Sequence, residues 1–360
     1  MGLDARDLLE ILLDTSHENF LIPAHIWTPW FSMLGSKSGF DSIQECFGDL
    51  TEYIFAVETG LSSDPEMNWR VKSLDVLTLI SNSDAHSPSK LGREANIFNT
   101  GRGFTDIKNT LQTGDPEKFL GTIEFFPEEG KYHLDGHRKC NFYSWPGETI
   151  QKEGICPVCG KPMTLGVLYR VEQLADRPEG KKPEKNHPYY SLVPLQEILS
   201  ELLSVGPNTK KVNMAYQQLL KKFGSELAIL YDIPSDSFQR TNVPLLGEAI
   251  RRIRKKEINI QPGYDGEFVK ITLFEPHEKT ALLGQKTLCV YKKPTGKRNK
   301  KNVKNLNKKK EKNENYKKLS HAEIKRSPVL NSRQKETVFH NDGPLMIVAG
   351  PGTGKTLTIT

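Results

Sequence analysis

Residues 76–88 read V-L-T-L-I-S-N-S-D-A-H-S-P, and they predict a buried β-strand that ends in a polar loop. The strand comes from the strong β-formers between Val76 and Ile80, and the Asn and Ser residues that follow end it. Asp84 and His86 then lie two residues apart, an arrangement that can chelate a zinc- or manganese-like ion. For such a pair alone, a surface Asp-x-His without a ligand is the commoner outcome.

Two upstream segments repeat this pattern. Residues 20–25 (F-L-I-P-A-H) form an apolar run that ends at His25, and residues 54–58 (I-F-A-V-E) form another that ends at Glu58. In a βα barrel, the rim at the carboxyl ends of the strands carries the active site. We therefore expect a metal site at this rim, with four ligands: His25, Glu58, Asp84 and His86. Three unrelated strand ends that are polar because they meet water are the alternative.

The neighbouring loops carry residues that suit nucleic-acid binding. Trp27 and Trp30 can stack on nucleobases, and Lys37 can hold a phosphate because it lies among Gly and Ser residues. Arg93, soon after His86, is a second phosphate candidate. Packing of the tryptophans in the core is the alternative.

Residues 137–159 contain two pairs of metal-ligand residues. His137 and Cys140 form the first pair, Cys156 and Cys159 form the second, and fifteen residues separate the pairs. This spacing is typical of a zinc ribbon. His133 is an alternative to His137 as a ligand. Because four protein ligands leave no open position, we expect a structural Zn²⁺ site that is not catalytic.

Helical periodicity appears at both ends of this region. Residues 4–13 predict an amphipathic helix, and residues 195–203 and 212–223 predict two more. Residues 249–256 place several cations on one helix, which suits either DNA or a solvated face. The Pro-rich residues 177–188 predict a polar hinge.

Composition limits the class of protein. The chain has 360 residues and a net charge of +6, enough length for two or three domains. The Lys/Asn-rich residues 292–318 predict a disordered linker that can hold nucleic acid loosely. No apolar run approaches the ~20 residues that a membrane helix needs, and no signal peptide is recognisable. We expect a cytoplasmic protein without a membrane partner.

The last residues form a nucleotide-binding motif. A predicted strand at residues 345–348 precedes A-G-P-G-T-G-K-T at residues 349–356, and a predicted helix follows. This context is that of a phosphate-binding loop for ATP with Mg²⁺. The residues expected to hold the nucleotide are Gly350, Gly352, Thr353, Gly354, Lys355 and Thr356.

Several long motifs together resemble the endonuclease Q family. They are A-H-I-W-T-P-W-F-x3-G-S-K-S-G-F, E-T-G-L-S-S-D-P-x-M-N-W, S-N-S-D-A-H-S-P and D-G-H-R-x-C…C-P-V-C-G-K-P. That family belongs to the polymerase-and-histidinol-phosphatase (PHP) metal-dependent phosphoesterases. The resemblance covers about residues 5–271.

The resemblance implies a DNA repair endonuclease. It implies cleavage by metal-activated water on the 5′ side of deaminated bases such as hypoxanthine and uracil, and at abasic sites. His25, Glu58, Asp84 and His86 are then the catalytic residues and bind a cluster of Zn²⁺, Mn²⁺ or Mg²⁺. The zinc ribbon and the helical region are expected to help hold the DNA. One departure is that the early His-x-His of PHP enzymes has no match before His25.

The C-terminal motifs resemble a different family. L-N-S-R-Q-K-E-T-V together with the phosphate-binding loop is similar to the opening of a UvrD/Rep-type superfamily 1 DNA helicase, in which Gln334 would contact the adenine. We expect the middle of a fusion of the two enzymes, truncated at both ends.

The expected fold is α/β, in five parts. These are the C-terminal half of a PHP (distorted βα) barrel at 1–117, a zinc ribbon at 118–178, a mostly helical DNA-binding domain at 179–291, a disordered linker at 292–326 and the start of a P-loop helicase domain at 327–360. Two other functions stay open: a non-catalytic DNA-binding arm of a helicase, and a PHP phosphatase for small molecules.

Overall fold

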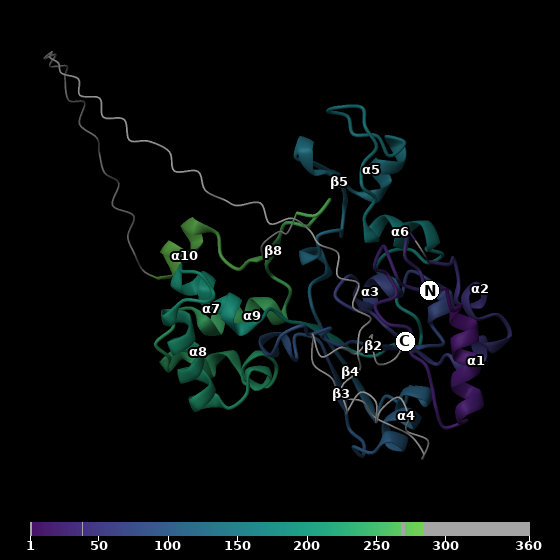
Figure 1. The fold of residues 1–360 in the computed structure, drawn as a ribbon. Coiled ribbons are helices and arrows are strands. Elements are labelled where there is room, and N and C mark those ends of the chain that lie inside the picture. The colour runs from purple at the N-terminus through teal and green to yellow at the C-terminus, as the bar shows by residue number, and fades with distance from the viewer. Residues whose placement is uncertain (1, 38, 268–270, 284–360) are drawn as a thin grey trace, which may run out of the picture. The chain divides into compact units, whose positions relative to one another are not determined.

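The computed structural model describes residues 2–37, 39–267 and 271–283, which form a mixed α/β fold (Figure 1). All of them belong to one compact unit, Met1–Gln285. The linker predicted at 292–326 and the helicase start predicted at 327–360 lie outside the described residues. So do the predicted nucleotide ligands Gln334, Gly350, Gly352, Thr353, Gly354, Lys355 and Thr356. In the described part of the chain, no helix has the length and apolarity to cross a membrane.

The N-terminal helix α1 (Ala5–Thr15) confirms the helix predicted at residues 4–13. Its N-cap is Asp4, whose side chain accepts a hydrogen bond from the Arg6 backbone N–H at 2.8 Å. Leu9 is fully buried and joins a core that also contains residues of α2 (Ile43–Phe47). The helix is therefore held by its apolar face, as its periodicity predicts.

Two short parallel strands confirm the strands predicted before Glu58 and Asp84. They are β1 (Ala56–Glu58) and β2 (Thr78–Ile80), with Glu58 opposite Ile80. The strand predicted at residues 20–25 is not a regular strand, which corrects that expectation. Its backbone does follow β1, since Glu58 N donates to Pro23 O at 3.0 Å and Ile26 N donates to Glu58 O at 3.1 Å. Pro23 has no N–H group and cannot complete a ladder.

A second sheet has the strand order β3 (Ala95–Phe98), β4 (Phe119–Glu124) and β7 (Tyr189–Ser191). The β3–β4 pair is antiparallel and the β4–β7 pair is parallel. Strand β4 is central in this sheet, and all but one of its residues are buried. Helix α4 (Phe104–Thr113) buries Leu111 in a small core with residues from both sheets.

Buried polar side chains connect the two sheets. Thr59, just after β1, donates from its hydroxyl to Glu124 Oε2 of β4 at 3.0 Å. Ser81, just after β2, donates to the Ile123 carbonyl at 2.9 Å. Burial raises the pKa of Glu124 to about 8, although the hydroxyls of Thr122 and Thr59 act in the opposite direction. The strand ends of both sheets are thus fixed to each other by hydrogen bonds that water does not reach.

A small hairpin follows the second sheet. Strands β5 (Asp135–His137) and β6 (Phe142–Ser144) are antiparallel, and helix α5 (Pro146–Gln151) comes after them. Helix α6 (Val167–Leu174) then buries Val167 and Val171 in the same core as Leu9 of α1. The short helix α3 (Pro65–Asn68) lies against α6.

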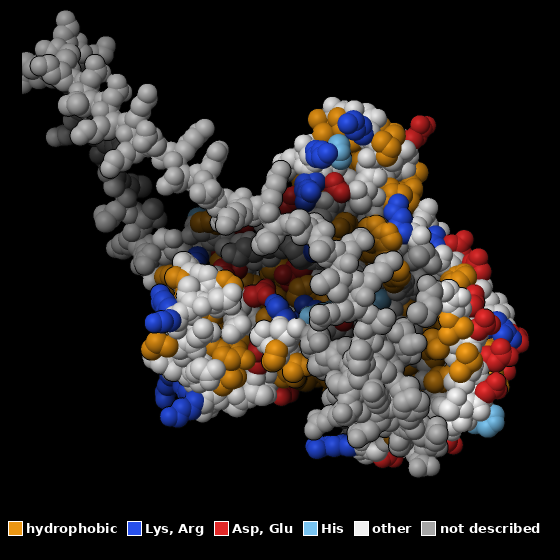
Figure 2. Space-filling view, in the orientation of Figure 1, with side chains coloured by type: hydrophobic (Ala, Val, Ile, Leu, Met, Phe, Trp, Pro, Cys, Tyr) orange, Lys and Arg blue, Asp and Glu red, His pale blue; other side chains and the backbone are white. Residues whose placement is uncertain are grey.

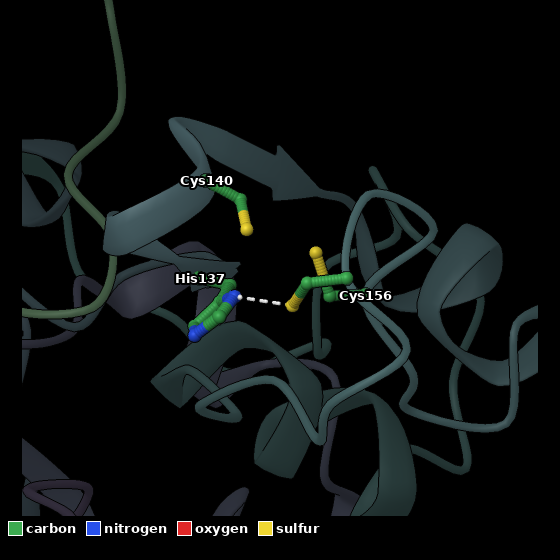
Figure 3. A group of neighbouring side chains, drawn as sticks. His137, Cys140 and Cys156 are labelled. Atoms are coloured by element: carbon green, nitrogen blue, oxygen red, sulfur yellow. Dashed lines mark hydrogen bonds between the residues drawn. The ribbon is translucent and has the colours of Figure 1, made fainter.

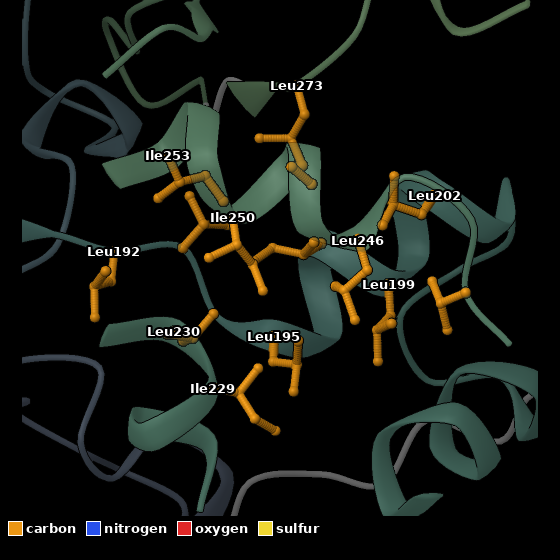
Figure 4. Close-up of a cluster of buried hydrophobic side chains, with 14 of the residues drawn as sticks. Leu192, Leu195, Leu199, Leu202, Ile229, Leu230, Leu246, Ile250, Ile253 and Leu273 are labelled. Carbon is orange, nitrogen blue, oxygen red and sulfur yellow. The ribbon is translucent and has the colours of Figure 1, made fainter. Parts of the chain in front are cut away.

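The C-terminal part is mostly helical. Helices α7 (Leu195–Leu203) and α8 (Lys210–Phe223) confirm the two helices predicted there. With α9 (Leu246–Arg254) they enclose an aliphatic core, in which Leu195, Leu199 and Ile250 are fully buried (Figure 4). Strands β8 (Asn259–Ile260) and β9 (Ile271–Thr272) and helix α10 (Pro276–Leu282) follow.

Two arginines of α9 form ion pairs within the protein. The sequence predicts that this helix either contacts DNA or faces solvent. Arg251 pairs with Glu248 at 2.8 Å and with Glu257 at 2.7 Å. Arg252 pairs with Glu248 at 2.8 Å, and its guanidinium lies 4.4 Å from the Phe274 ring centre. These two arginines are engaged by internal partners, while Lys255 and Lys256 are exposed, so a DNA surface at residues 249–256 stays a prediction.

The segment predicted to be a hinge, residues 177–188, is tied to the body at its start. Arg177 donates to both carboxylate oxygens of Asp75, and Arg70 donates to the Arg177 carbonyl at 2.8 Å. A bidentate guanidinium–carboxylate pair has a fixed geometry. The first residue of the segment is therefore bonded to the rest of the domain, which a free hinge would not be.

Replacing Trp27 by Phe tests the core beneath the rim. The Trp27 indole N–H donates to Asn68 Oδ1 at 2.8 Å, and both side chains are fully buried. Trp27→Phe leaves that oxygen unpaired, so we expect a loss of about 1–3 kcal/mol in the free energy of unfolding, measured by urea titration. Trp145→Phe is the matched control, because Trp145 is 50% exposed. Equal stability of the two variants would contradict a stabilising role for the Trp27–Asn68 hydrogen bond.

The buried carboxyl groups predict a pH dependence of stability. Burial, and next the Glu124 charge, raise the pKa of Glu94 to about 9 from an ordinary value of 4.5. The folded protein then binds more protons than the unfolded chain between about pH 4.5 and 9, so stability falls as pH rises through this range. Glu94→Gln should flatten the fall in melting temperature between pH 5 and 9. Replacement of the exposed Glu52 by Gln should leave it unchanged.

Candidate functional site

Four ligand-type side chains converge at the β5–β6 hairpin. The ligand atoms of His137, Cys140, Cys156 and Cys159 all lie within 4.8 Å of one another. Figure 3 shows His137, Cys140 and Cys156 directed toward one point, and the dashed line marks the 3.2 Å contact between His137 Nδ1 and Cys159 Sγ. One nitrogen and three sulfur donors fit a tetrahedral Zn²⁺ ion. The group thus has both the chemistry and the geometry of a structural zinc site.

Local backbone structure holds these ligands. His137 ends β5, and Cys140 lies in the turn before β6, where Asn141 adopts a left-handed φ of 49°. In the second turn, Cys156 N donates to Lys161 O at 2.8 Å. Burial opposes ionisation of Cys156, but the backbone N–H groups of the turn and His137 lower the pKa of this thiol to about 7. This turn therefore favours the thiolate form of Cys156, the form that binds a metal, whereas the neighbouring thiols of Cys159 and Cys156 and burial raise the pKa of Cys140 to about 11.

The structure decides between the two histidines. His133 is only 5% exposed and is not a member of the ligand group. Its burial lowers its pKa to about 4, so the ring is neutral near pH 7. His137 is therefore the residue that completes the set.

The rim predicted to bind a catalytic metal begins at His25 and Glu58. His25 N donates to Glu58 Oε2 at 2.7 Å, so the two residues are in direct contact. Gly60 makes this approach possible, because a Cβ atom at Gly60 would lie 2.6 Å from His25 Cβ. Gly60 also has a φ of +65°, which favours glycine.

The second oxygen of Glu58 is held by Asn82, which follows β2 and is itself held by Asn96 of β3; sequence reasoning identified neither residue. Asn82 Nδ2 donates to Glu58 Oε1 at 2.9 Å, and Asn96 Nδ2 donates to Asn82 Oδ1 at 3.1 Å. Asn96 also exchanges two hydrogen bonds with the backbone of Ser81. The only sequence signal was the position of Asn82 at the end of a predicted strand.

Asp84 and His86 lie on the exposed side of the rim. Their side chains are 59% and 78% exposed, and His86 Nδ1 lies 2.8 Å from the Asp84 carbonyl oxygen. Asp84 has a φ of 42°, which Asp tolerates better than most residues. Arg93 Nε donates to the Ser83 carbonyl at 2.9 Å, so this phosphate candidate also holds the loop.

The four rim residues do not gather into a metal site by themselves. Among the described residues, only the His137 group brings three or more ligand atoms close enough to hold a metal ion. Both Glu58 oxygens accept hydrogen bonds from the protein. The donor types suit a divalent cation, but this geometry does not. Their role as catalytic metal ligands stays a prediction.

The aromatic residues after His25 differ in exposure. Trp27 is fully buried, so its position supports the packing role and not stacking on DNA. Trp30 is 47% exposed and packs edge-on against Tyr132, with ring centres 5.8 Å apart. Lys37 is exposed, as a phosphate ligand requires.

Zinc content tests the ligand group. We expect about one Zn²⁺ per chain by elemental analysis, and we expect Cys156→Ser and His137→Ala to lower that content, because each removes one of four ligands. His133→Gln and Cys46→Ala should retain zinc, since both residues lie outside the group. Well-folded protein without zinc would contradict the assignment.

Two family models match this chain. Residues 194–257 match the MJ0043 C-terminal domain, and residues 330–360 match the UvrD/REP helicase N-terminal domain. Two uncharacterized proteins are similar to it: MJ0043 of Methanocaldococcus jannaschii is 35% identical over 281 residues, and YqxK of Bacillus subtilis is 33% identical over 252 residues. These alignments cover 75% and 69% of this chain, but only 34% and 60% of those proteins.

Two solved structures share the fold and the sequence pattern. The lesion-specific endonuclease PfuEndoQ from Pyrococcus furiosus matches 75% of this chain and 66% of its own, with a TM-score of 0.68 and 31% identity. An endonuclease Q bound to a 27-mer duplex with an abasic lesion at its active site matches 78% of this chain and 69% of its own, with a TM-score of 0.67 and 30% identity. This chain therefore belongs to the endonuclease Q family.

Proposed function

We propose that this chain is the incising part of a DNA repair endonuclease. Its reaction is hydrolysis of the phosphodiester on the 5′ side of a deaminated base, such as hypoxanthine or uracil, or of an abasic site. The observation that carries the proposal is the match, over 78% of this chain, to an endonuclease Q that holds an abasic duplex at its active site. The chain spans a third to three fifths of the length of its curated relatives, so the activity is a proposal.

The rim between β1 and β2 is the proposed site of incision. It combines the anchored pair of His25 and Glu58 with the exposed pair of Asp84 and His86. Arg93, which lies 3.5 Å from the Asp84 carbonyl through Nη2, keeps the exposed loop in place. No step is assigned to a metal held by these four residues alone, and dependence on Zn²⁺, Mn²⁺ or Mg²⁺ stays a prediction.

The zinc-binding part offers a second surface for DNA. Exposed hydrophobic side chains and cations lie together on this part of the surface, over β5 and α5 at the top of Figure 2. They include Tyr143, Trp145, Lys139 and Lys161, whereas Arg138 in the same part pairs with Glu267 at 3.6 Å. Aromatic and cationic side chains in proximity suit stacking on bases and contact with phosphates. By contrast, Asp and Glu side chains gather over α1 and α2, at the right edge of the same view.

The match of residues 330–360 supports a second activity in the same protein. We propose that the incising part is joined to an ATP-dependent DNA helicase of the UvrD/Rep type, with ATP and Mg²⁺ held by the phosphate-binding loop. Incision followed by strand separation would give access to the damaged strand from the nick.

One observation favours a second candidate function. The rim residues do not form a metal site by themselves, so the chain can also act as a DNA-binding arm that delivers a helicase without cutting. Incision assays separate the two functions. We expect cutting of duplexes that contain one hypoxanthine, uracil or abasic site, and no cutting of the undamaged duplex. Selective binding without cutting would support the arm, and neither binding nor cutting would contradict both.

Removal of the Asp84 charge tests the proposed rim. Asp84→Asn keeps a residue that tolerates the left-handed backbone, so the loop should remain intact. We expect single-turnover incision to fall by about 10³-fold, the scale of losing one major electrostatic element of catalysis. Affinity for lesion DNA should change little. Asp14→Asn, an exposed carboxylate of α1, is the control. Normal cutting by Asp84→Asn would exclude this rim.

A further inference from the structure

Phe31 has an unusual position for an aromatic residue. It is 90% exposed, more than any other large hydrophobic side chain in the described part of the chain. Its backbone has a φ of 57°, in the left-handed region that bulky residues rarely adopt. Such strain persists only where the surroundings enforce it, and it often accompanies function.

The loop around Phe31 is tightly built. Leu34 N donates to Ile26 O at 2.8 Å, and Lys37 N donates to Pro29 O at 2.9 Å, so the two arms of the loop are bonded to each other. Gly35 permits this contact, since a Cβ atom there would lie 2.2 Å from the Thr28 carbonyl oxygen. Phe31 therefore projects from a fixed support.

The same loop is bonded to the proposed site of incision. The Thr28 hydroxyl lies 3.2 Å from His25 Nδ1 and 3.1 Å from the carbonyl oxygen of Trp30. One side chain thus connects the rim histidine to the residue that precedes Phe31. Phe31 therefore follows a residue that is joined to the rim histidine through this hydroxyl.

We propose that Phe31 enters duplex DNA at the lesion and stacks in the space that a missing or extrahelical base leaves. This inference rests on the proposed function. Apolar side chains that insert between base steps are a known way to hold distorted DNA, and an abasic site offers that space without the cost of unstacking a base. The exposed Lys37 in the same loop suits the adjacent phosphates.

Trp30 gives the tip a second aromatic surface. It is half-exposed and braced by Tyr132, which comes from the segment that leads to the zinc-binding hairpin. A braced ring loses little conformational entropy when it stacks. We assign Trp30 to the base beside the gap and Phe31 to the gap itself.

Equilibrium binding tests this proposal. Fluorescence anisotropy would compare an abasic duplex with the undamaged duplex of the same sequence, for wild type, Phe31→Ala, Phe31→Trp and Tyr53→Ala, with gel analysis to confirm intact DNA. Phe31→Ala should lower the preference for the abasic duplex by about tenfold, the scale of one lost base–aromatic stack. Phe31→Trp should retain the preference. Tyr53, an exposed aromatic residue outside the loop, should be replaceable without effect.

A second measurement reports insertion itself. A 2-aminopurine base opposite the abasic site should change its fluorescence when wild type or Phe31→Trp binds, and much less when Phe31→Ala binds. If wild type prefers the abasic duplex and Phe31→Ala keeps that preference, the inference is wrong while the proposed function stands. If wild type shows no preference for any lesion, the proposed function fails and the inference fails with it.

Discussion

The buried carboxyl group of Glu124 is the contact on which the arrangement of the strand ends depends. It accepts hydrogen bonds from Thr122 of its own strand and from Thr59, which follows β1. A carboxyl group without exposed surface is tolerated only when it is hydrogen-bonded, and its raised pKa shows that burial favours the neutral form. The link fixes the end of β1 against β4, and with it the position of Glu58, one residue earlier.

The sequence predicted a structural zinc site and a catalytic metal site. The structure brings the ligands of the first together but not those of the second. The zinc ligands come from two turns within about twenty residues, so local structure suffices to bring them together. The rim ligands come from three separate segments, and Glu58 is already satisfied by His25 and Asn82. Hydrogen bonds within the protein therefore hold the Glu58 carboxylate in place. Glu58 is the last residue of β1, and Asp84 and His86 lie in the loop that follows β2, which is the edge where βα enzymes carry their active sites.

The helical part and the part that carries the His137 group have different surfaces. The α9 arginines, which looked suited to DNA, are engaged with Glu248, Glu257 and Glu278. The zinc-binding part instead exposes cations beside aromatic side chains. Charge on a helix therefore says little about partners until its internal ion pairs are known.

The sequence by itself determined the local features: the strands before Glu58 and Asp84, the helices at 195–203 and 212–223, and the spacing of the zinc ligands. Each depends on residues close together in the chain, where periodicity and turn chemistry act. Only the tertiary structure decided that His137 and not His133 completes the zinc group, that Trp27 is core, and that Asn82 and Asn96 hold Glu58. These outcomes depend on contacts between distant segments. From the sequence, either histidine could bind zinc, and Trp27 could lie in the core or stack on a base. The segment before His25 shows the limit most clearly: Pro23 has no N–H group to donate, and His25, with a φ of 33°, donates its N–H to the Glu58 side chain.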